Sequence, residues 1–299
     1  MFLAQNLVCQ YKHQIIIVMK IIKPSASVRN ILFLFLIFPV FLSAQDDNLR
    51  YETNKAFTTG EYLKLRIYFH SFITGKLSAG YATLKIQDSK DTLYGREVMH
   101  VKGHGTTSKA FGWFYDIDDR YETFIDVKTL APWKFVRRVN EGGYIINHDT
   151  YFDQRKSEAF FRDNKNDERK TLKTPKYIQD VLSIIYYART FDYSKADEGD
   201  IFETDFMIDD TTYTARIKYA GKENIKTDLG KFKCIKIIPL LDMKGVFNEE
   251  DPMVLYVSDD KNRVPMFGES ELKVGSMRVE LIEYDGLRNY FSSSIRWND

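Results

Sequence analysis

The 299-residue sequence has few cysteines, few prolines and no excess of charge of either sign. It contains 2 Cys, 7 Pro and 16 Gly, and its 43 Lys and Arg residues nearly balance its 42 Asp and Glu residues. This balance excludes the basic surface of a general nucleic-acid binder and the acidic excess of a disordered tail. Because hydrophobic residues make up 44% of the chain, we expect a folded globular protein.

The sequence also has no apolar run long enough to cross a membrane. Residues 31–42 form an uncharged apolar run that falls short of the about 20 residues that a spanning helix needs. Lys20, Lys23 and Arg29 precede this run, and the small residue Ala44 stands near its exit. A basic start, a short apolar run and a small exit residue are typical of a secretory signal peptide, so we expect cleavage after Ala44.

The expected leader divides the chain into a signal peptide, residues 1–44, and a single β-rich domain, residues 45–299. Met19 begins a leader of ordinary length, so residues 1–18 are interpreted as an over-extended gene start. The alternative is an uncleaved N-terminal anchor that also uses the apolar residues before Lys23, although charges interrupt that stretch. Cleavage would place the mature chain in the periplasm or cell envelope, without an integral membrane span.

Alternation of apolar and polar residues predicts strands along most of the mature chain. In residues 61–69, Leu63, Leu65 and Ile67 share one face, as in a half-buried strand. Similar stretches are residues 81–86, 97–103, 120–126, 133–140, 144–152, 156–162, 202–208, 212–220, 232–239, 253–257, 264–272 and 276–284. The polar stretch 163–173 is predicted to be a surface loop. Many short strands joined by hairpin turns favour an antiparallel sheet curled into an incomplete β-barrel.

Residues 175–189 are the predicted exception, a helix. Thr174 is a suitable cap and Pro175 a suitable first residue. The apolar positions at helical spacing are Ile178, Val181, Leu182, Ile185 and Ala188. Since the helix would be apolar nearly all round, we expect it to be buried inside the curled sheet.

Patterns for catalysis or metal binding are absent. His100 and His104 are in a strand-like stretch, where this spacing places them about 13 Å apart. Cys234 has no activating neighbour, and no nucleophile elbow or phosphate-binding glycine loop is present. We therefore predict no catalytic residues, no metal site and no cofactor. The acidic clusters 116–119 and 249–251 lack a recognised calcium-loop spacing, so surface turns are the favoured interpretation.

Four aromatic residues near Gly112 give the most informative local signal. Phe111, Trp113, Phe114 and Tyr115 cannot all face one core from an alternating strand, so some are candidates for ligand contact. The alternative is plain core packing across a bent strand. Three residues on the second face of the predicted helix complete the set of candidate ligand-binding residues: Tyr177, Ile184 and Tyr187.

An ordered series of motifs resembles the domain of unknown function 3108 family. The motifs are residues 57–65, 78–80, 130–133, 141–143, 179–183, 186–189, 231–234, 257–265 and 274–276, within about residues 55–288. The resemblance implies an exported bacterial envelope protein with an incomplete barrel, similar to lipoprotein-carrier half-barrels, around a helix. The family has no established activity, so no catalytic residues carry over.

Three functional interpretations follow. The favoured one is a non-enzymatic protein that binds an apolar or lipid-like molecule, or an envelope component, in the concave face of the sheet. The second is a structural envelope scaffold whose barrel is filled by side chains. The third is an envelope hydrolase that uses carboxylates such as Asp116, Asp118 or Glu141. No nucleic-acid partner is expected under any of them.

Overall fold

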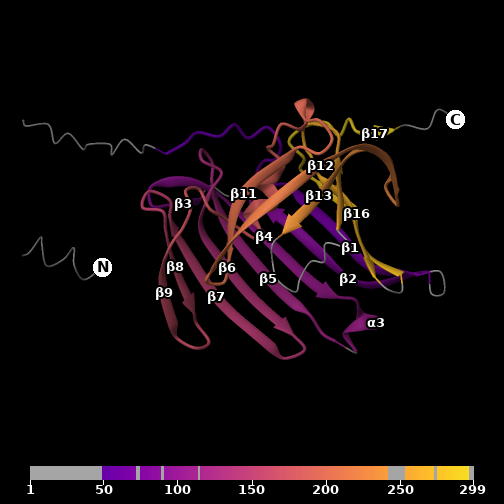
Figure 1. The fold of residues 1–299 in the computed structure, drawn as a ribbon. Coiled ribbons are helices and arrows are strands. Elements are labelled where there is room, and N and C mark those ends of the chain that lie inside the picture. The colour runs from indigo at the N-terminus through magenta and orange to yellow at the C-terminus, as the bar shows by residue number, and fades with distance from the viewer. Residues whose placement is uncertain are drawn as a thin grey trace, which may run out of the picture. The chain divides into compact units, whose positions relative to one another are not determined.

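The structure, a computed structural model, describes residues 49–295 except for 72–74, 89–90, 114, 242–252 and 273–274 (Figure 1). The expected leader, residues 1–44, and the acidic cluster 249–251 lie outside the described residues. Export and cleavage therefore stay predictions.

The described chain is mainly β, and its strands belong to a single 17-stranded sheet. The strands are β1 (Tyr62–Ser71), β2 (Gly75–Ile86), β3 (Asp91–Leu93), β4 (Arg96–Thr107), β5 (Asp118–Asp126), β6 (Pro132–Glu141), β7 (Tyr144–Asp153), β8 (Glu158–Asp163), β9 (Glu168–Lys173), β10 (Gln179–Asp180), β11 (Ile201–Ile208), β12 (Thr211–Thr227), β13 (Gly230–Leu241), β14 (Val254–Ser258), β15 (Pro265–Leu272), β16 (Gly275–Asp285) and β17 (Ser294–Ile295). The strand prediction is therefore confirmed for the fold class.

Pairing runs continuously from β9 back to β4, through β2 and β1 to β16, and then back along the chain to β11. These ladders are antiparallel, whereas β10 pairs with β11 in parallel. Figure 1 shows β4–β9 as a broad twisted array beside β11–β13. Among the described strands no ladder joins β9 to β11, so the sheet is not closed into a barrel.

The polar stretch after β8 is a strand and not the predicted loop. β9 pairs with β8 through six residue pairs, from Glu158↔Lys173 to Asp163↔Glu168. Its residues are mostly exposed. Only Leu172 of this edge strand packs against the core, so the strand has no apolar alternation, which is why the sequence pattern missed it.

The helices in the described residues are α3 (Lys109–Gly112), α4 (Ser183–Ala188) and the 3₁₀ turn η2 (Tyr193–Lys195). None of them has both the length and the apolar character that crossing a bilayer requires. The predicted 15-residue helix is wrong in extent, since only six of its residues are helical. The wrapping of the sheet around a long apolar helix is not confirmed.

The side chain of Asp180 explains the late start of α4. Tyr177 has φ +60, a left-handed conformation that interrupts a helix. Gln179 and Asp180 then pair with β11. The amides of Leu182 and Ser183 both donate to Asp180 Oδ1 at 2.8 Å, so this carboxylate caps the chain where the helix begins.

Burial of the predicted apolar stripe is also uneven. Ile178 and Leu182 are buried, as expected, and Val181 packs against the main core from a half-buried position. Ile185 is 40% exposed, contrary to the prediction. With only six residues, α4 covers the main core on one side and leaves its other side open.

Candidate functional site

The aromatic segment around α3 is a surface feature. Trp113 is 82% exposed and Tyr115 is 48% exposed. The Tyr115 ring lies over Gly142, where an added Cβ would come within 2.7 Å of Cε2. Phe114 and the side chain of Phe111 lie outside the described part of the chain. Trp113 and Tyr115 are therefore not brought together with the candidates near α4.

Tyr177 and Tyr187 hold the segment before β1. The guanidinium of Arg50 lies 4.3 Å from the Tyr177 ring centroid and 4.9 Å from that of Tyr187. The Arg50 amide also donates to Tyr177 Oη at 2.7 Å. These contacts give both tyrosines a structural role, and neither lines the cavity beside α4.

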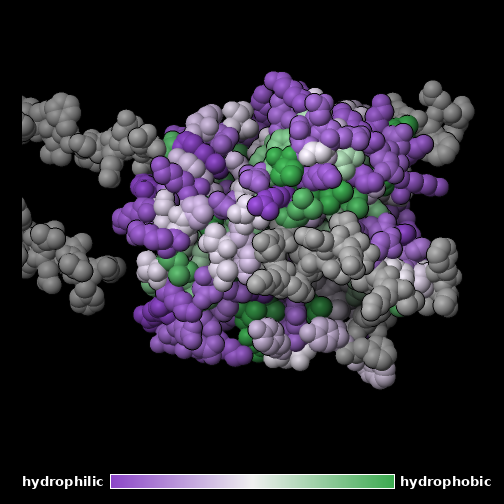
Figure 2. All heavy atoms as spheres, in the orientation of Figure 1, coloured by the Kyte–Doolittle hydropathy of each residue, from purple (hydrophilic) through white to green (hydrophobic). Residues whose placement is uncertain are grey.

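Ile184 is the candidate residue that does line a cavity. This cavity has a volume of about 240 Å³ and lies between α4 and strands β12–β15. Its walls are almost wholly apolar, and the residues that line it are Ile184, Ile185, Ala188, Arg189, Tyr193, Ala215, Ile217, Ile237, Pro239, Met253, Leu255, Tyr256, Val257, Pro265 and Phe267. Figure 2 shows apolar residues gathered on the face in view, over the position of β12 and β13. We refer to this space as the α4 cavity.

The strand register produces the apolar wall of the α4 cavity. Ile217 of β12 pairs with Pro239 of β13, and Ile237 pairs with Leu255 of β14. Residues directly opposite each other share a face of the sheet, so these side chains form one surface. Leu255 in turn faces Gly268 of β15, where an added Cβ would lie 2.8 Å from Leu255 Cδ2. A larger residue at that glycine would displace the leucine.

Polar groups beside the α4 cavity already have partners. Arg189 donates to both oxygens of Glu61, at 2.6 and 2.8 Å, and both side chains are buried. The Tyr193 hydroxyl donates to the Ala188 carbonyl at 3.2 Å. The Tyr256 hydroxyl donates to Glu223, and burial together with that carboxylate raises the pKa of Tyr256 to about 12. Among the described residues that line it, the cavity therefore offers apolar contact and no reactive group.

The carboxylates of the hydrolase interpretation lie elsewhere. His104 bonds Asp118 at 2.7 Å, and this hydrogen bond, with Arg120 nearby, lowers the pKa of Asp118. Glu141 has a raised pKa, caused first by burial and then by the neighbouring Asp119. The backbone amide of Asn140 donates a hydrogen bond to Asp119 Oδ1 at 3.0 Å. None of these carboxylates lines the α4 cavity.

Cys234 and His100, for which the sequence favoured structural roles, have the following surroundings. Cys234 is fully buried, and burial raises the pKa of its thiol to about 12, which is typical of an inert thiol. His100 bonds Glu122 at 2.6 Å across the β4–β5 ladder. Within the described ranges, no three His, Cys, Asp or Glu side chains are arranged to hold a metal ion.

Sequence reasoning missed most of the α4 cavity. Its walls come from four stretches that alternation had placed in strands, but the pairing of those strands is not visible in one sequence. The available signal was a surplus of aliphatic residues at alternate positions, such as Ile217, Ile237 and Leu255.

Several solved structures are similar to this chain. A β-barrel-like protein of domain of unknown function DUF1849 from Brucella abortus has 11% identity and a TM-score of 0.50, and the match covers 76% of this chain and 97% of that one. An exported-protein candidate with a YmcC-like fold from Bacteroides fragilis has 11% identity and a TM-score of 0.30, with 79% and 99% covered. A lipoprotein candidate from Parabacteroides distasonis has 12% identity and a TM-score of 0.33, with 80% and 100% covered. The similarity to the Brucella protein supports the β-rich fold alone.

Among curated protein sequences, none matches this chain. The family model described as "Protein of unknown function (DUF3108)" matches residues 64–282, which is most of the chain. This range contains nearly all the motifs on which the sequence resemblance was based. The chain therefore belongs to the DUF3108 family.

Proposed function

We propose that this protein is a non-enzymatic binder of an apolar or lipid-like molecule, which it holds in the α4 cavity. The observation that supports the proposal is an apolar space of about 240 Å³ with aliphatic and aromatic walls. Ligand pockets are typically apolar with a few placed polar groups, and they have volumes of about 300–1,000 Å³. The α4 cavity is slightly below this range, which suits one acyl chain and not a whole lipid.

The chemistry of the walls fits a hydrocarbon ligand. Each methylene group transferred from water into such a space contributes about 0.8 kcal/mol, so a short acyl segment binds without any polar contact. The charged side chain at the edge, Arg189, is already neutralised by Glu61. A ligand carboxylate or phosphate would therefore remain outside, in solvent.

We also propose that the protein works in the cell envelope after export. The support is the leader pattern of residues 20–44, with its basic residues and short apolar run. The intact mass of protein purified from its native envelope tests this proposal. A mature chain that begins near Gln45 is expected, whereas retention of residues 20–44 would contradict cleavage.

The substitution Ile184→Asp tests ligand binding. A carboxylate in the apolar wall should weaken binding of the fluorescent fatty acid cis-parinaric acid at least tenfold, and it should remove co-purifying lipid detected by mass spectrometry. The matched control is Ile201→Asp, since Ile201 is exposed on β11 and does not line the cavity. Equal binding by both variants, or no binding by the parent protein, would exclude the lipid proposal.

The structural scaffold is the second candidate. Its support is the large packed core, in which side chains as big as Trp133, Tyr186 and Phe57 are fully buried. A scaffold would bind neither cis-parinaric acid nor lipid, so the same experiment separates the two functions. The carboxylate hydrolase stays a prediction.

A further inference from the structure

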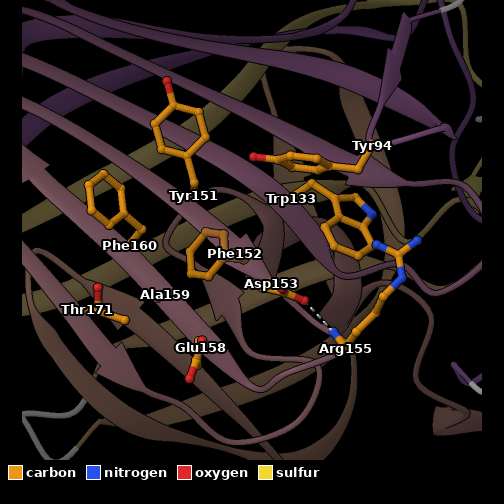
Figure 3. Close-up of a pocket in the computed structure, with 10 residues that line it drawn as sticks. All are labelled: Tyr94, Trp133, Tyr151, Phe152, Asp153, Arg155, Glu158, Ala159, Phe160 and Thr171. Carbon is orange, nitrogen blue, oxygen red and sulfur yellow. Dashed lines mark hydrogen bonds between the residues drawn. The ribbon is translucent and has the colours of Figure 1, made fainter. Parts of the chain in front are cut away.

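A second cavity lies at the end of β6–β8, beside the turn between β3 and β4. Its volume is about 310 Å³. Figure 3 shows the rings of Tyr94, Trp133, Tyr151 and Phe160 around it, together with the side chains of Asp153, Arg155 and Glu158. We refer to this space as the aromatic cleft. The proposed lipid binding does not use it.

Trp133 forms a rigid wall of the aromatic cleft. Its indole Nε1 donates to Asp126 Oδ2 at 2.8 Å, and Asp126 is itself bound by Arg96. The Tyr94 ring centroid lies 5.7 Å from that of Trp133, and the guanidinium of Arg155 lies 4.9 Å from the indole. These contacts fix the plane of the indole before any ligand arrives.

Tyr94 occupies a position that disfavours its residue type. Tyr94 and Gly95 have φ of +52 and +77, and they connect β3 and β4 as a two-residue turn. Such turns favour Asn-Gly, because a bulky residue with positive φ is strained. Tyr94 is also 58% exposed, so its contact with Trp133 buries only part of the residue. What the tyrosine supplies at this turn is an aromatic face at the mouth of the cleft.

The charged groups of the aromatic cleft are balanced. Asp153 is paired with Lys156 at 3.4 Å, and Glu158 accepts from Lys173 at 2.7 Å. Arg155 lies against the Trp133 ring. Since both carboxylates and the guanidinium have partners of opposite charge or a π face, a charged ligand would have to break existing contacts. A neutral ligand rich in hydroxyl groups would add hydrogen bonds without breaking them.

The rings continue outward from the cleft in a row across the sheet. Tyr151 of β7 is directly opposite Phe160 of β8, and on its other side is Lys134 of β6. The ladder continues through Phe124 of β5 to His100 of β4, whose rings stack at 4.1 Å. Adjacent strands are about 4.8 Å apart. That spacing is similar to the length of one sugar unit in an extended chain.

The row lies on the outward face of the sheet. The alternate residues Phe135, Phe152 and Phe161 are buried in the main core, so their neighbours Lys134, Tyr151 and Phe160 project from the other face. The next row on that face is charged except for one valine: Lys102, Glu122, Val136, Asp149, Arg162 and Arg169. The row is thus two pairs of rings, with Lys134 between Tyr151 and Phe124, next to a mostly charged row. Such a surface suits a ligand with both apolar and hydroxyl edges.

We infer that the aromatic cleft and the adjoining row bind a neutral glycan chain. The apolar C–H face of a pyranose ring stacks on Tyr94, Tyr151 and Phe160, and its hydroxyl groups bond the carboxylates and guanidinium of the cleft. Tyr94 and Phe160 are exposed and Tyr151 is half-buried, so these rings are accessible to a ligand. Aromatic cross-strand pairs do stabilise sheets, but they account for the row alone and not for the strained turn at Tyr94.

The substitution Tyr94→Asn tests the inference. Asn is favoured at this turn position, so the variant is expected to fold at least as stably as the parent. Titration calorimetry would use hexamers of β-1,4-linked glucose and of β-1,4-linked N-acetylglucosamine. We expect the parent protein to bind at least one of them, and Tyr94→Asn to bind it about tenfold more weakly. The matched control Tyr144→Asn, at an exposed tyrosine that does not line the cleft, should bind like the parent.

Two results would overturn the inference. One is the absence of binding of both hexasaccharides to the parent at millimolar concentration, and the other is equal affinity of Tyr94→Asn and the parent. Binding of cis-parinaric acid should be unchanged by Tyr94→Asn, because the two cavities have no lining residue in common. Failure of the glycan inference is thus distinguishable from failure of the lipid proposal.

Discussion

The two sides of α4 differ in what they contact. Leu182, just before the helix, and Tyr186 are buried in the main core, where the Leu182 side chain approaches Gly103 of β4. Ile184 and Ala188, on the other side, line the α4 cavity. Leu182 and Tyr186 on the packed side are four residues apart, and so are Ile184 and Ala188 on the open side. This spacing places each pair on one face of a helix.

This difference suggests that the packed side of α4 stabilises the helix, while the other side faces a cavity. Six residues are too few to form a helix alone in water, so tertiary contacts of the packed side hold it in place. The open side makes fewer contacts with packed atoms, so stability should depend on it less. If this is correct, equivalent substitutions on the two sides should have very different effects on stability.

The largest effect is expected at Arg189, which follows α4. Replacing it by Met leaves the fully buried Glu61 carboxylate without its partner. Breaking a buried ion pair on one side typically costs about 3–5 kcal/mol, which urea unfolding would measure. The double variant Arg189→Met with Glu61→Gln should recover part of the loss. Equal losses in the single and double variants would contradict this role for the ion pair.

Leu182→Ala should have the next largest effect. The side chain is buried, and its Cδ1 would lie 3.4 Å from a Cβ placed at Gly103, so truncation leaves a cavity in the main core. Such truncations cost about 2–5 kcal/mol, through lost transfer energy and the cavity together. Urea unfolding at neutral pH gives the value. A loss below about 1 kcal/mol would mean that α4 is held by other contacts.

How far the sequence predicted this region depends on the kind of signal. Alternation identified most strands, because each of them has one face in the core. Residues 175–189 were apolar at helical spacing, but the left-handed Tyr177 and the capping by Asp180 depend on contacts with β11 and with the backbone of α4 itself. Tertiary pairing therefore overrode a local helical pattern.

For the candidate sites too, the sequence did not contain the tertiary contacts that bring residues together. Ile184, predicted from the second face of an apolar helix, lines the α4 cavity, and its role as a ligand contact stays a prediction. Trp113 and Tyr115 are exposed, and a cluster of rings in sequence does not determine whether the rings point inward. The aromatic cleft left one local trace, the Tyr94-Gly95 turn between alternating segments. Its other rings are brought together by the register of β6–β8, which a single sequence does not contain.

Asp180, at the start of the packed side, should make stability depend on pH. Burial raises its pKa from 3.8 to about 6, despite hydrogen bonds from Thr123 and two backbone amides. The native state therefore binds this proton more tightly than the unfolded state. As pH rises from about 4 to about 6, this group destabilises the fold, in the opposite direction to an ordinary ion-paired aspartate.

The variant Asp180→Asn isolates that contribution. Asn keeps an oxygen for the two amides and does not ionise, so it should equal the parent near pH 4 and exceed it near pH 7. The difference in unfolding free energy should be at most about 3 kcal/mol, the value of roughly two pKa units. Unfolding curves of both proteins at several pH values would measure it. A constant difference across pH would show that Asp180 does not titrate in this range.

The smallest effect is expected for Ile184→Ala, on the open side. This is the same kind of truncation as Leu182→Ala, but Ile184 is only half-buried and faces an existing space. Truncation there creates no new void within packed atoms, so the loss should be about 1 kcal/mol or less. Urea unfolding of the two variants side by side gives the comparison directly. Because the variant enlarges the α4 cavity, it should still bind cis-parinaric acid. If Ile184→Ala instead costs as much as Leu182→Ala, both sides of α4 are packed, and the main support for a ligand space beside the helix is lost.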